Sequence, residues 1–197
     1  MTSPRLEQQM AFVVEVDKLK SVHRQTLLID RSRHENSAEH SWHLALMALL
    51  LSEHATTPGL DVLKVIRMVV LHDLVEIDAG DTFCYDAEGV QGQHEREVLA
   101  ADRIFGMLPE DQALEFRAAW DEFEAQETPE AQFAATIDRL QPMLNNFHTD
   151  GFSWQHHGIR KEQVQARHAG GKKGSEAVWK FGEDLIDEAV RQGILRA

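Results

Sequence analysis

The sequence has little cysteine and no long apolar run. Its single cysteine, Cys84, excludes an internal disulfide framework and any zinc site that is built from several thiolates. No stretch approaches the roughly 20 consecutive apolar residues that a membrane-spanning helix needs, and residues 1–5 begin no secretory apolar segment. We therefore expect a cytoplasmic protein that does not associate with a membrane.

Basic residues are also scarce, since 20 Lys and Arg stand against 33 Asp and Glu and leave a formal net charge of −13. A protein that binds a nucleic acid duplex normally presents a basic face. The excess of acid therefore argues against nucleic acid as a partner. It does not exclude a small phosphorylated substrate, because a metal ion and a few Arg or Lys side chains can reverse the field inside one cleft.

Alternation of apolar and polar residues, which is typical of half-buried strands, is missing as well. No strands are expected, and the predicted fold is all-α. Apolar positions at helical spacing, separated by Gly, Pro and polar breaks, indicate a bundle of five to seven helices. The main helices are expected at about residues 6–19, 37–55, 61–77, 93–107, 109–125, 129–147 and 175–192.

Some details of these helices can be predicted too. Ser37 is a suitable N-cap and would place His40 in the first turn of its helix. The apolar stripe of that helix is expected to face the core, and it consists of Ala38, Trp42, Ala45, Leu46, Leu49 and Leu50. Pro142 should kink the helix that contains it. Residues 149–174 should be mostly irregular, with one short helix near 160–168 and with their histidines in solvent.

An adjacent pair, His72 and Asp73, stands near the end of the most apolar helix, and Glu76 follows one turn later. On a helix, residues at i and i+4 share a face, so His72 and Glu76 project together. An imidazole and a carboxylate from neighbouring positions make half of a divalent-metal site. For such a pair alone, the simpler interpretation is a helix end whose polar side chains are solvated.

Two further candidates complete a possible ligand set of His40, His72, Asp73 and Asp138. Asp138 follows a run of small and apolar residues, which indicates that it points towards the core. A buried carboxylate needs a partner, because burying an unpaired charge is costly. An ion pair or a helix cap would satisfy it, and so would a metal held together with two histidines and a second acid. The spacing alone does not decide between these interpretations.

Two longer strings narrow the choice, namely ENSAEHS at residues 35–41 and HDLVEIDAGD at residues 72–81. On an all-helical chain the pattern resembles the HD-domain phosphohydrolase superfamily, and the strings are similar to those of its 5′-deoxynucleotidase branch. The match covers about residues 18–146. It implies a single HD domain over residues 1–197, with a metal site buried between helices and a C-terminal extension over residues 149–197.

The resemblance implies that His40, His72, Asp73 and Asp138 bind one divalent cation. His43 competes with His40 for the ligand role, and the AEHS string favours His40. The family's metal is usually Mn²⁺ or Co²⁺, with Mg²⁺, Zn²⁺, Fe²⁺ and Ni²⁺ as alternatives. Mixed nitrogen and oxygen ligands without a thiolate are compatible with that range.

The resemblance also implies roles for residues beside the metal. Glu76 and Asp81 match the family's acids, and either could be the group that transfers a proton. Arg24 matches an arginine that holds the substrate phosphate, with Arg33 and Arg139 as reserve candidates. Gln25 departs from the pattern, because bacterial relatives have a tryptophan there that crowds the 2′ position of the sugar. The preference for deoxyribose is therefore open.

The function that this resemblance implies is metal-dependent hydrolysis of (deoxy)nucleoside 5′-monophosphates to nucleoside and phosphate, by a homodimer. One alternative is hydrolysis of another nucleotide phosphoester, such as a guanosine tetraphosphate alarmone. A second alternative, from a different class, is a binding protein that keeps the metal only as a structural centre. A panel of phosphoester substrates separates the three.

Overall fold

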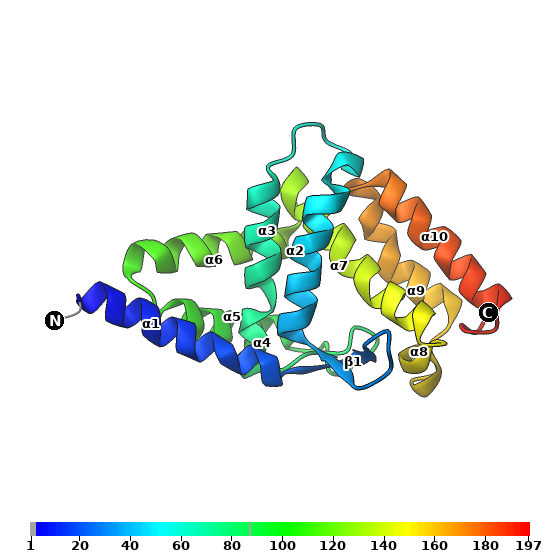
Figure 1. The fold of residues 1–197 in the computed structure, drawn as a ribbon, viewed down its shortest axis with the longest axis horizontal. Coiled ribbons are helices and arrows are strands. Elements are labelled where there is room, and N and C mark those ends of the chain that lie inside the picture. The colour runs from blue at the N-terminus through cyan, green and yellow to red at the C-terminus, as the bar shows by residue number, and fades with distance from the viewer. Residues whose placement is uncertain (1–2, 87) are drawn as a thin grey trace.

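The computed structural model describes residues 3–86 and 88–197, and helices dominate it, which confirms the all-α prediction (Figure 1). The α-helices are α1 (Pro4–Val16), α2 (Ser37–Leu51), α3 (Val62–Leu71), α4 (Glu76–Ala79), α5 (Gln93–Phe105), α6 (Glu110–Ala125), α7 (Pro129–His148), α8 (Phe152–His156), α9 (Lys161–His168) and α10 (Glu176–Arg191). The 3₁₀ turns are η1 (Asp17–Ser21), η2 (Ser52–His54), η3 (His72–Val75) and η4 (Ala169–Lys173). The number of helices exceeds the predicted five to seven because several short ones, such as α4 and α8, were not expected.

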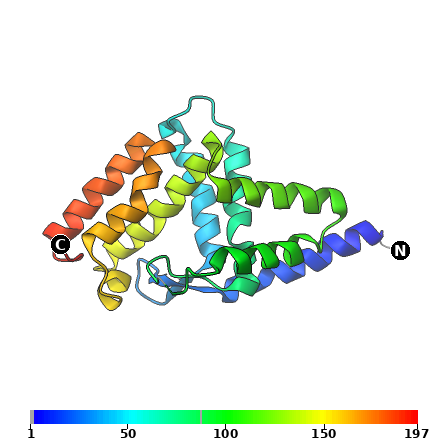
Figure 2. The same ribbon diagram turned by 180° about the vertical axis from the view of Figure 1, so that it is seen from behind.

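Helix α7 is the centre of the bundle. It runs between α2 and α3 on one side and α9 and α10 on the other, as both views show (Figures 1 and 2). It continues through Pro142 as one helix, so the proline that was expected to kink or loosen it does not end it. Phe133 and Ile137 of α7 pack against Leu44 of α2 and Val69 of α3 in one buried cluster. The same cluster includes Leu140 and, partly buried, Leu144, so apolar packing flanks the proline on both sides.

Strands were not expected, and this prediction was wrong. β1 (His23–Leu27) and β2 (His34–Asn36) form a short antiparallel hairpin, with His23 opposite Asn36. The Leu28 amide donates to the Arg33 carbonyl at 3.0 Å and helps to close the connecting turn. The strands are too short to show an alternating pattern in the sequence, and they pack on α7 and α8. The hairpin matters because it carries Arg24 and Gln25.

The start of α2 also differs from the prediction. Asn36, not Ser37, is the N-cap, and it forms a capping box with Glu39. The Glu39 amide donates to Asn36 Oδ1 at 2.9 Å, and the Asn36 amide donates to Glu39 Oε2 at 3.2 Å. The hydroxyl of Ser37 is therefore free to bond elsewhere, and it donates to a carboxylate of the site.

The large side chains of the apolar stripe predicted for α2 face solvent instead of the core, and only its alanines, Ala38 and Ala45, pack against buried residues. Trp42, Leu49 and Leu50 are 66%, 60% and 63% exposed. The buried face contains Leu44 and Ala48 together with polar side chains. Because α2 is apolar nearly all round, its sequence does not indicate which face is buried, and the polar residues of the site decide it.

The predicted helix over residues 61–77 is interrupted at the site. α3 ends at Leu71, and a 3₁₀ turn carries His72 and Asp73 before α4 begins at Glu76. No Gly or Pro marks this interruption in the sequence. The tighter turn changes the directions in which the three polar side chains point, relative to a continuous helix.

The C-terminal extension is more regular than expected. Residues 149–174 contain α8, α9 and η4, and Ser175 caps α10 by accepting from the Val178 amide at 3.1 Å. His156 and His157 are exposed as predicted, but His168 is fully buried, with its Nε2 2.8 Å from the Trp179 carbonyl. The extension packs on α7 and so helps to enclose the site. Within the described part of the chain, no helix has the length and apolar character that crossing a bilayer requires.

Candidate metal centre

The four predicted ligands come from three elements that meet at the middle of the bundle. His40 lies in the first turn of α2, His72 and Asp73 in η3, and Asp138 in α7. One ligand atom from each of His40, His72 and Asp73 lies within 4.8 Å of the others. Asp138 Oδ1 lies 3.0 Å from His40 Nε2 and 3.7 Å from His72 Nε2. The fold thus brings all four residues together.

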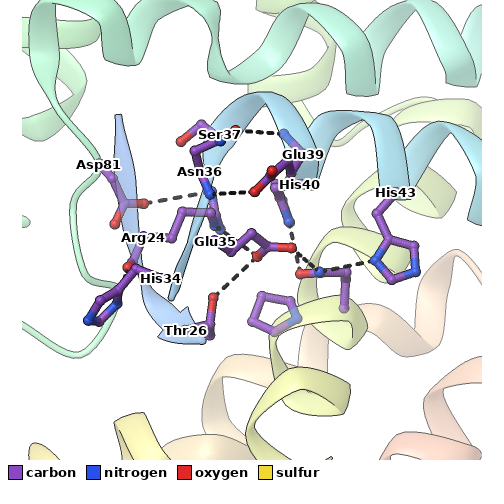
Figure 3. A network of polar contacts seen from close by, with 12 residues as sticks. Arg24, Thr26, His34, Glu35, Asn36, Ser37, Glu39, His40, His43 and Asp81 are labelled. Atoms are coloured by element: carbon purple, nitrogen blue, oxygen red, sulfur yellow. Dashed lines mark hydrogen bonds and ion pairs between the residues drawn. The ribbon is translucent and has the colours of Figure 1, made fainter. Parts of the chain in front are cut away.

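The tautomer of His40 is set by its neighbours. The buried carboxylate of Glu35 can only accept, and it accepts from Gln141 Nε2 at 2.7 Å (Figure 3). Gln141 therefore turns its Oε1 towards His40, and His40 Nδ1 donates to it at 2.9 Å. The Nε2 lone pair of His40 is left pointing at the acids. Neither Glu35 nor Gln141 was predicted to act here, although Glu35 belongs to the ENSAEHS string.

His72 is oriented in the same way by the backbone. Its Nδ1 donates to the Val69 carbonyl at 2.8 Å, so its Nε2 also carries a lone pair towards the acids. This Nε2 is buried, and it has no hydrogen-bond partner within residues 3–86 and 88–197. It lies only 3.0 Å from Asp73 Oδ1. Two acceptors at that distance repel each other unless a positive charge stands near both, so the donor set fits a cation.

The charges of these histidines and carboxylates also fit a bound cation. Burial opposes protonation of His72, but the negative charges of Asp73 and Asp138 outweigh it and raise its pKa well above the usual value. Burial alone would raise the pKa of Asp138, yet the two histidines hold it well below its usual value. A proton on a histidine or a bound metal ion can balance the negative charge of Asp73 and Asp138. A metal ion would compete with protons for the same atoms.

The remaining predicted site residues surround this group. Arg24 Nη1 donates to Asp73 Oδ2 at 3.0 Å and lies 3.7 Å from Asp81 Oδ1. Ser37 Oγ donates to Glu76 Oε2 at 2.6 Å, and Glu76 is buried. Burial and the nearby charge of Asp73 raise the pKa of Glu76 well above its usual value.

Burial and the neighbouring charges affect the pKa values of Asp81 and Arg24 differently. Burial raises the pKa of Asp81, and Arg24 only partly opposes this effect. Burial disfavours the charged form of Arg24, but Asp73 and the neighbouring acids raise its pKa, so the guanidinium remains protonated. The site therefore contains a fixed positive charge beside two carboxyl groups that hold protons more tightly than usual.

Two of the three competing candidates, His43 and Arg33, lie outside this group. His43 Nδ1 is 3.3 Å from Gln141 Nε2, and His43 is not among the residues whose ligand atoms lie within 4.8 Å of one another. Arg33 is exposed and pairs with Glu39 at 2.5 Å. Arg139, the other reserve arginine, does line the same cavity as Arg24.

A cavity of about 240 Å³ opens beside the group and is lined by several predicted residues, among them Arg24 and Gln25. Gln25 Oε1 lies 3.1 Å from Nε2 of His157, which comes from the C-terminal extension. The ring of His157 also lies 4.4 Å from that of Phe83, which lines the cavity. The extension, which had no assigned role, therefore supports one wall of the site.

Comparison with known proteins places this arrangement in a family. A model described as "HD domain" matches residues 16–179, which is most of the chain. The chain belongs to the HD-domain family. The four residues that converge in the site stand at the positions from which the resemblance was inferred.

Relatives of this HD-domain protein include 5′-deoxynucleotidase HDDC2 from Homo sapiens, which is 29% identical over 112 residues, or 57% of this chain and 53% of the relative. HDDC2 from Xenopus laevis is 27% identical over 136 residues, or 68% of this chain and 66% of the relative. The match thus spans about half the length of the human protein. A crystal structure described as a predicted metal-dependent phosphohydrolase from Magnetospirillum magnetotacticum has 50% identity and a TM-score of 0.93, over 99% of this chain and 100% of the other.

Proposed function

We propose that this HD-domain protein is a metal-dependent phosphomonoesterase that hydrolyses nucleoside 5′-monophosphates to nucleoside and phosphate. One observation carries the proposal: two imidazole lone pairs and two carboxylates converge on a buried point beside Arg24, in the wall of a cavity. The relatives named as 5′-deoxynucleotidases support the nucleotide as the substrate class.

His40, His72, Asp73 and Asp138 would hold one divalent cation. Nitrogen and oxygen donors without thiolate suit Mn²⁺, Co²⁺ and other first-row metals. Such an ion supplies positive charge to the phosphoryl oxygens and lowers the pKa of water in its coordination shell. The hydrogen bonds of Gln141 and of the Val69 carbonyl hold the two imidazole rings with Nε2 facing inward.

The protein's own groups would manage the phosphate and the protons. Arg24, which is half-buried and charged, would hold the non-bridging phosphate oxygens through its planar fork of donors. Glu76, with its raised pKa, would accept a proton from the attacking water, while Ser37 orients its carboxyl. The bond from phosphorus to the 5′-oxygen then breaks, and Asp81 would supply the proton that the leaving oxygen needs.

Gln25 would contact the sugar. His157 lies within hydrogen-bonding distance of its amide oxygen. The side chain offers both a donor and an acceptor to a ribose hydroxyl. We therefore expect ribonucleotides to be accepted alongside deoxyribonucleotides.

Phosphate release from ribo- and deoxyribonucleoside 5′-monophosphates tests the proposal, with Mn²⁺, Co²⁺, Mg²⁺ or a chelator in each assay. Release should depend on the metal, and His72→Ala should abolish it while the far-UV circular dichroism spectrum stays that of a folded helical protein. His54→Ala, in the exposed turn η2, is a matched control that should retain activity. Substantial metal-dependent release by His72→Ala would refute the assignment. A folded, metal-loaded wild type that hydrolyses no phosphoester would favour the alternative of a binding protein with a structural metal.

A further inference from the structure

Two arginines of the cavity lie apart from the acids around Arg24. Arg139 is half-buried and follows Asp138 in α7, whereas Arg167 is exposed in α9, within the C-terminal extension. The two helices pack against each other, and both arginines line the same cavity. The guanidinium carbon of Arg139 also lies 3.5 Å from the position that a Cβ of Gly170 would occupy. The pair thus forms a positive wall made by α7 and the extension.

Neither arginine is neutralised by an acid. Within residues 3–86 and 88–197, no carboxylate oxygen lies within 4.0 Å of a nitrogen of Arg139 or Arg167. Arg139 instead donates to Gln126 Oε1 at 2.7 Å and to the Ala135 carbonyl at 2.9 Å. In a protein with 13 excess negative charges, two neighbouring unpaired arginines in one cavity are an unusual arrangement that an anion would relieve.

This positive wall is separate from the place assigned to the scissile phosphate. Arg24 lies among the acids of the candidate metal centre, with its Nη1 3.0 Å from Asp73 Oδ2 and 3.7 Å from Asp81 Oδ1. Arg139 has different neighbours, because its guanidinium donates to the Ala135 carbonyl and to Gln126 Oε1. Arg167 comes from α9 and lines the same cavity as Arg139 and Cys84. The cavity therefore has two positive regions, and one substrate that fills it would meet both.

We infer that Arg139 and Arg167 form a subsite for a second phosphate, carried on the nucleoside part of the substrate. The preferred substrate class would then be a nucleoside bisphosphate, with the 5′-phosphate at the metal centre and the other phosphate on the arginine pair. Two guanidinium groups can each offer a fork of donors to phosphate oxygens, which gives strong and directional binding. The inference rests on the proposed function only for the identity of the group that is hydrolysed.

Kinetics with two matched substrates test the subsite. The rate of phosphate release is measured for 2′-deoxyadenosine 5′-monophosphate and for 2′-deoxyadenosine 3′,5′-bisphosphate, with wild type, Arg139→Lys, Arg167→Gln and a control, Arg191→Gln. Arg191 carries the same charge but is 73% exposed on α10 and does not line the cavity. The wild type should prefer the bisphosphate in kcat/KM.

Arg167→Gln should reduce this preference about tenfold, because hydrogen bonds between charged groups are individually worth roughly that factor or more. Arg139→Lys keeps the charge but loses the fork, so it should reduce the preference by a smaller factor. Arg191→Gln should leave the preference as it is. Equal losses for both substrates, or an unchanged preference in Arg167→Gln, would overturn the inference.

Binding measured without turnover separates this inference from the proposed function. Calorimetric titration in chelator gives the Kd of the bisphosphate, of the monophosphate and of inorganic phosphate. If no substrate is hydrolysed but the bisphosphate still binds more tightly through Arg167, the subsite stands and the proposed reaction fails. If hydrolysis proceeds but both nucleotides bind equally, the subsite fails. Arg167-dependent binding of inorganic phosphate, with no difference between the nucleotides, would mean that the pair holds free phosphate and would also overturn the inference.

Discussion

Replacing Gln141 with leucine tests whether the network behind His40 prepares the metal centre. Gln141 is fully buried, and leucine matches its size while removing both polar groups. The substitution removes the acceptor for His40 Nδ1 and the donor to Glu35 Oε1. Glu35 would keep only its hydrogen bond from Thr26 Oγ1 at 3.2 Å and the more distant Arg24 at 3.9 Å.

The size of the effect follows from these contacts. A lost hydrogen bond to a charged group costs roughly 1.5–3 kcal/mol, and Glu35 remains partly paired, so we expect the lower part of that range. For a chain of this length, each kcal/mol shifts Tm by roughly 2–4 °C. His40 is also freed to adopt the other tautomer or to rotate, and loss of such an outer partner typically weakens metal affinity about 10–100-fold.

The assay combines calorimetric titration with Mn²⁺ and thermal unfolding. Gln141→Leu should bind metal about 10–100-fold more weakly and unfold several degrees earlier, and any hydrolysis should recover in excess metal. Gln132→Leu is a matched control on the same helix, because its amide donates only to the exposed Glu127 carbonyl. Unchanged metal affinity in a folded Gln141→Leu protein would refute the idea that this network orients His40.

Other predictions concern phosphate binding, metal, pH and assembly. Arg24→Gln should lower kcat/KM about 10–100-fold while metal is retained, because it removes charge-assisted contacts to phosphate, and steady-state kinetics with parallel metal analysis checks this. Metal at 100 times its Kd should stabilise the fold by about 2.7 kcal/mol, and a chelator should remove that gain in a thermal scan. Partial desolvation at the cavity wall and the charge of Glu97 raise the pKa of Glu124 to about 7, so the folded state holds this proton more tightly than the unfolded chain and loses relative stability as pH rises from about 4.5 to 7. Glu124→Gln should therefore stabilise the protein more at pH 8 than at pH 5.5, by less than about 1 kcal/mol because Glu124 is exposed and screened. If the exposed apolar face of α2 joins two copies, Trp42→Glu should shift a dimer towards monomer in sedimentation equilibrium, whereas Glu at Leu114, an equally exposed site on α6, should not.

Each of these has a result that would count against it. Loss of bound metal in Arg24→Gln would make its effect structural rather than a matter of phosphate binding. A chelator that leaves Tm unchanged in a metal-loaded sample would mean that no metal supports the fold. An equal gain for Glu124→Gln at both pH values would exclude titration of that carboxyl as its cause, and a monomeric wild type would remove the basis for the Trp42 test.

The four candidate metal ligands could be predicted from the sequence, because each either has another candidate beside it in the chain, belongs to a motif string or follows an apolar run. His72 and Asp73 are adjacent, and Asp138 follows an apolar run, so a partner of opposite charge could be inferred for it. The buried face of α2 could not be predicted from the sequence, because a helix that is apolar nearly all round shows no periodicity that marks its inner face. The strands around Arg24 were missed for a related reason, since they contain at most five residues and pair only through the hairpin.

The sequence by itself determined the helical class, the family motifs and the residue types that could hold a metal. Only the tertiary structure decided which of those groups face one another, because hydrogen-bond networks join residues that are about 100 positions apart, as Gln141 joins Glu35 and His40. It also decided that Arg167, from an extension without a recognised motif, meets Arg139 in the same cavity. Local patterns record short-range preferences, whereas burial and charge pairing across the bundle depend on how distant segments pack.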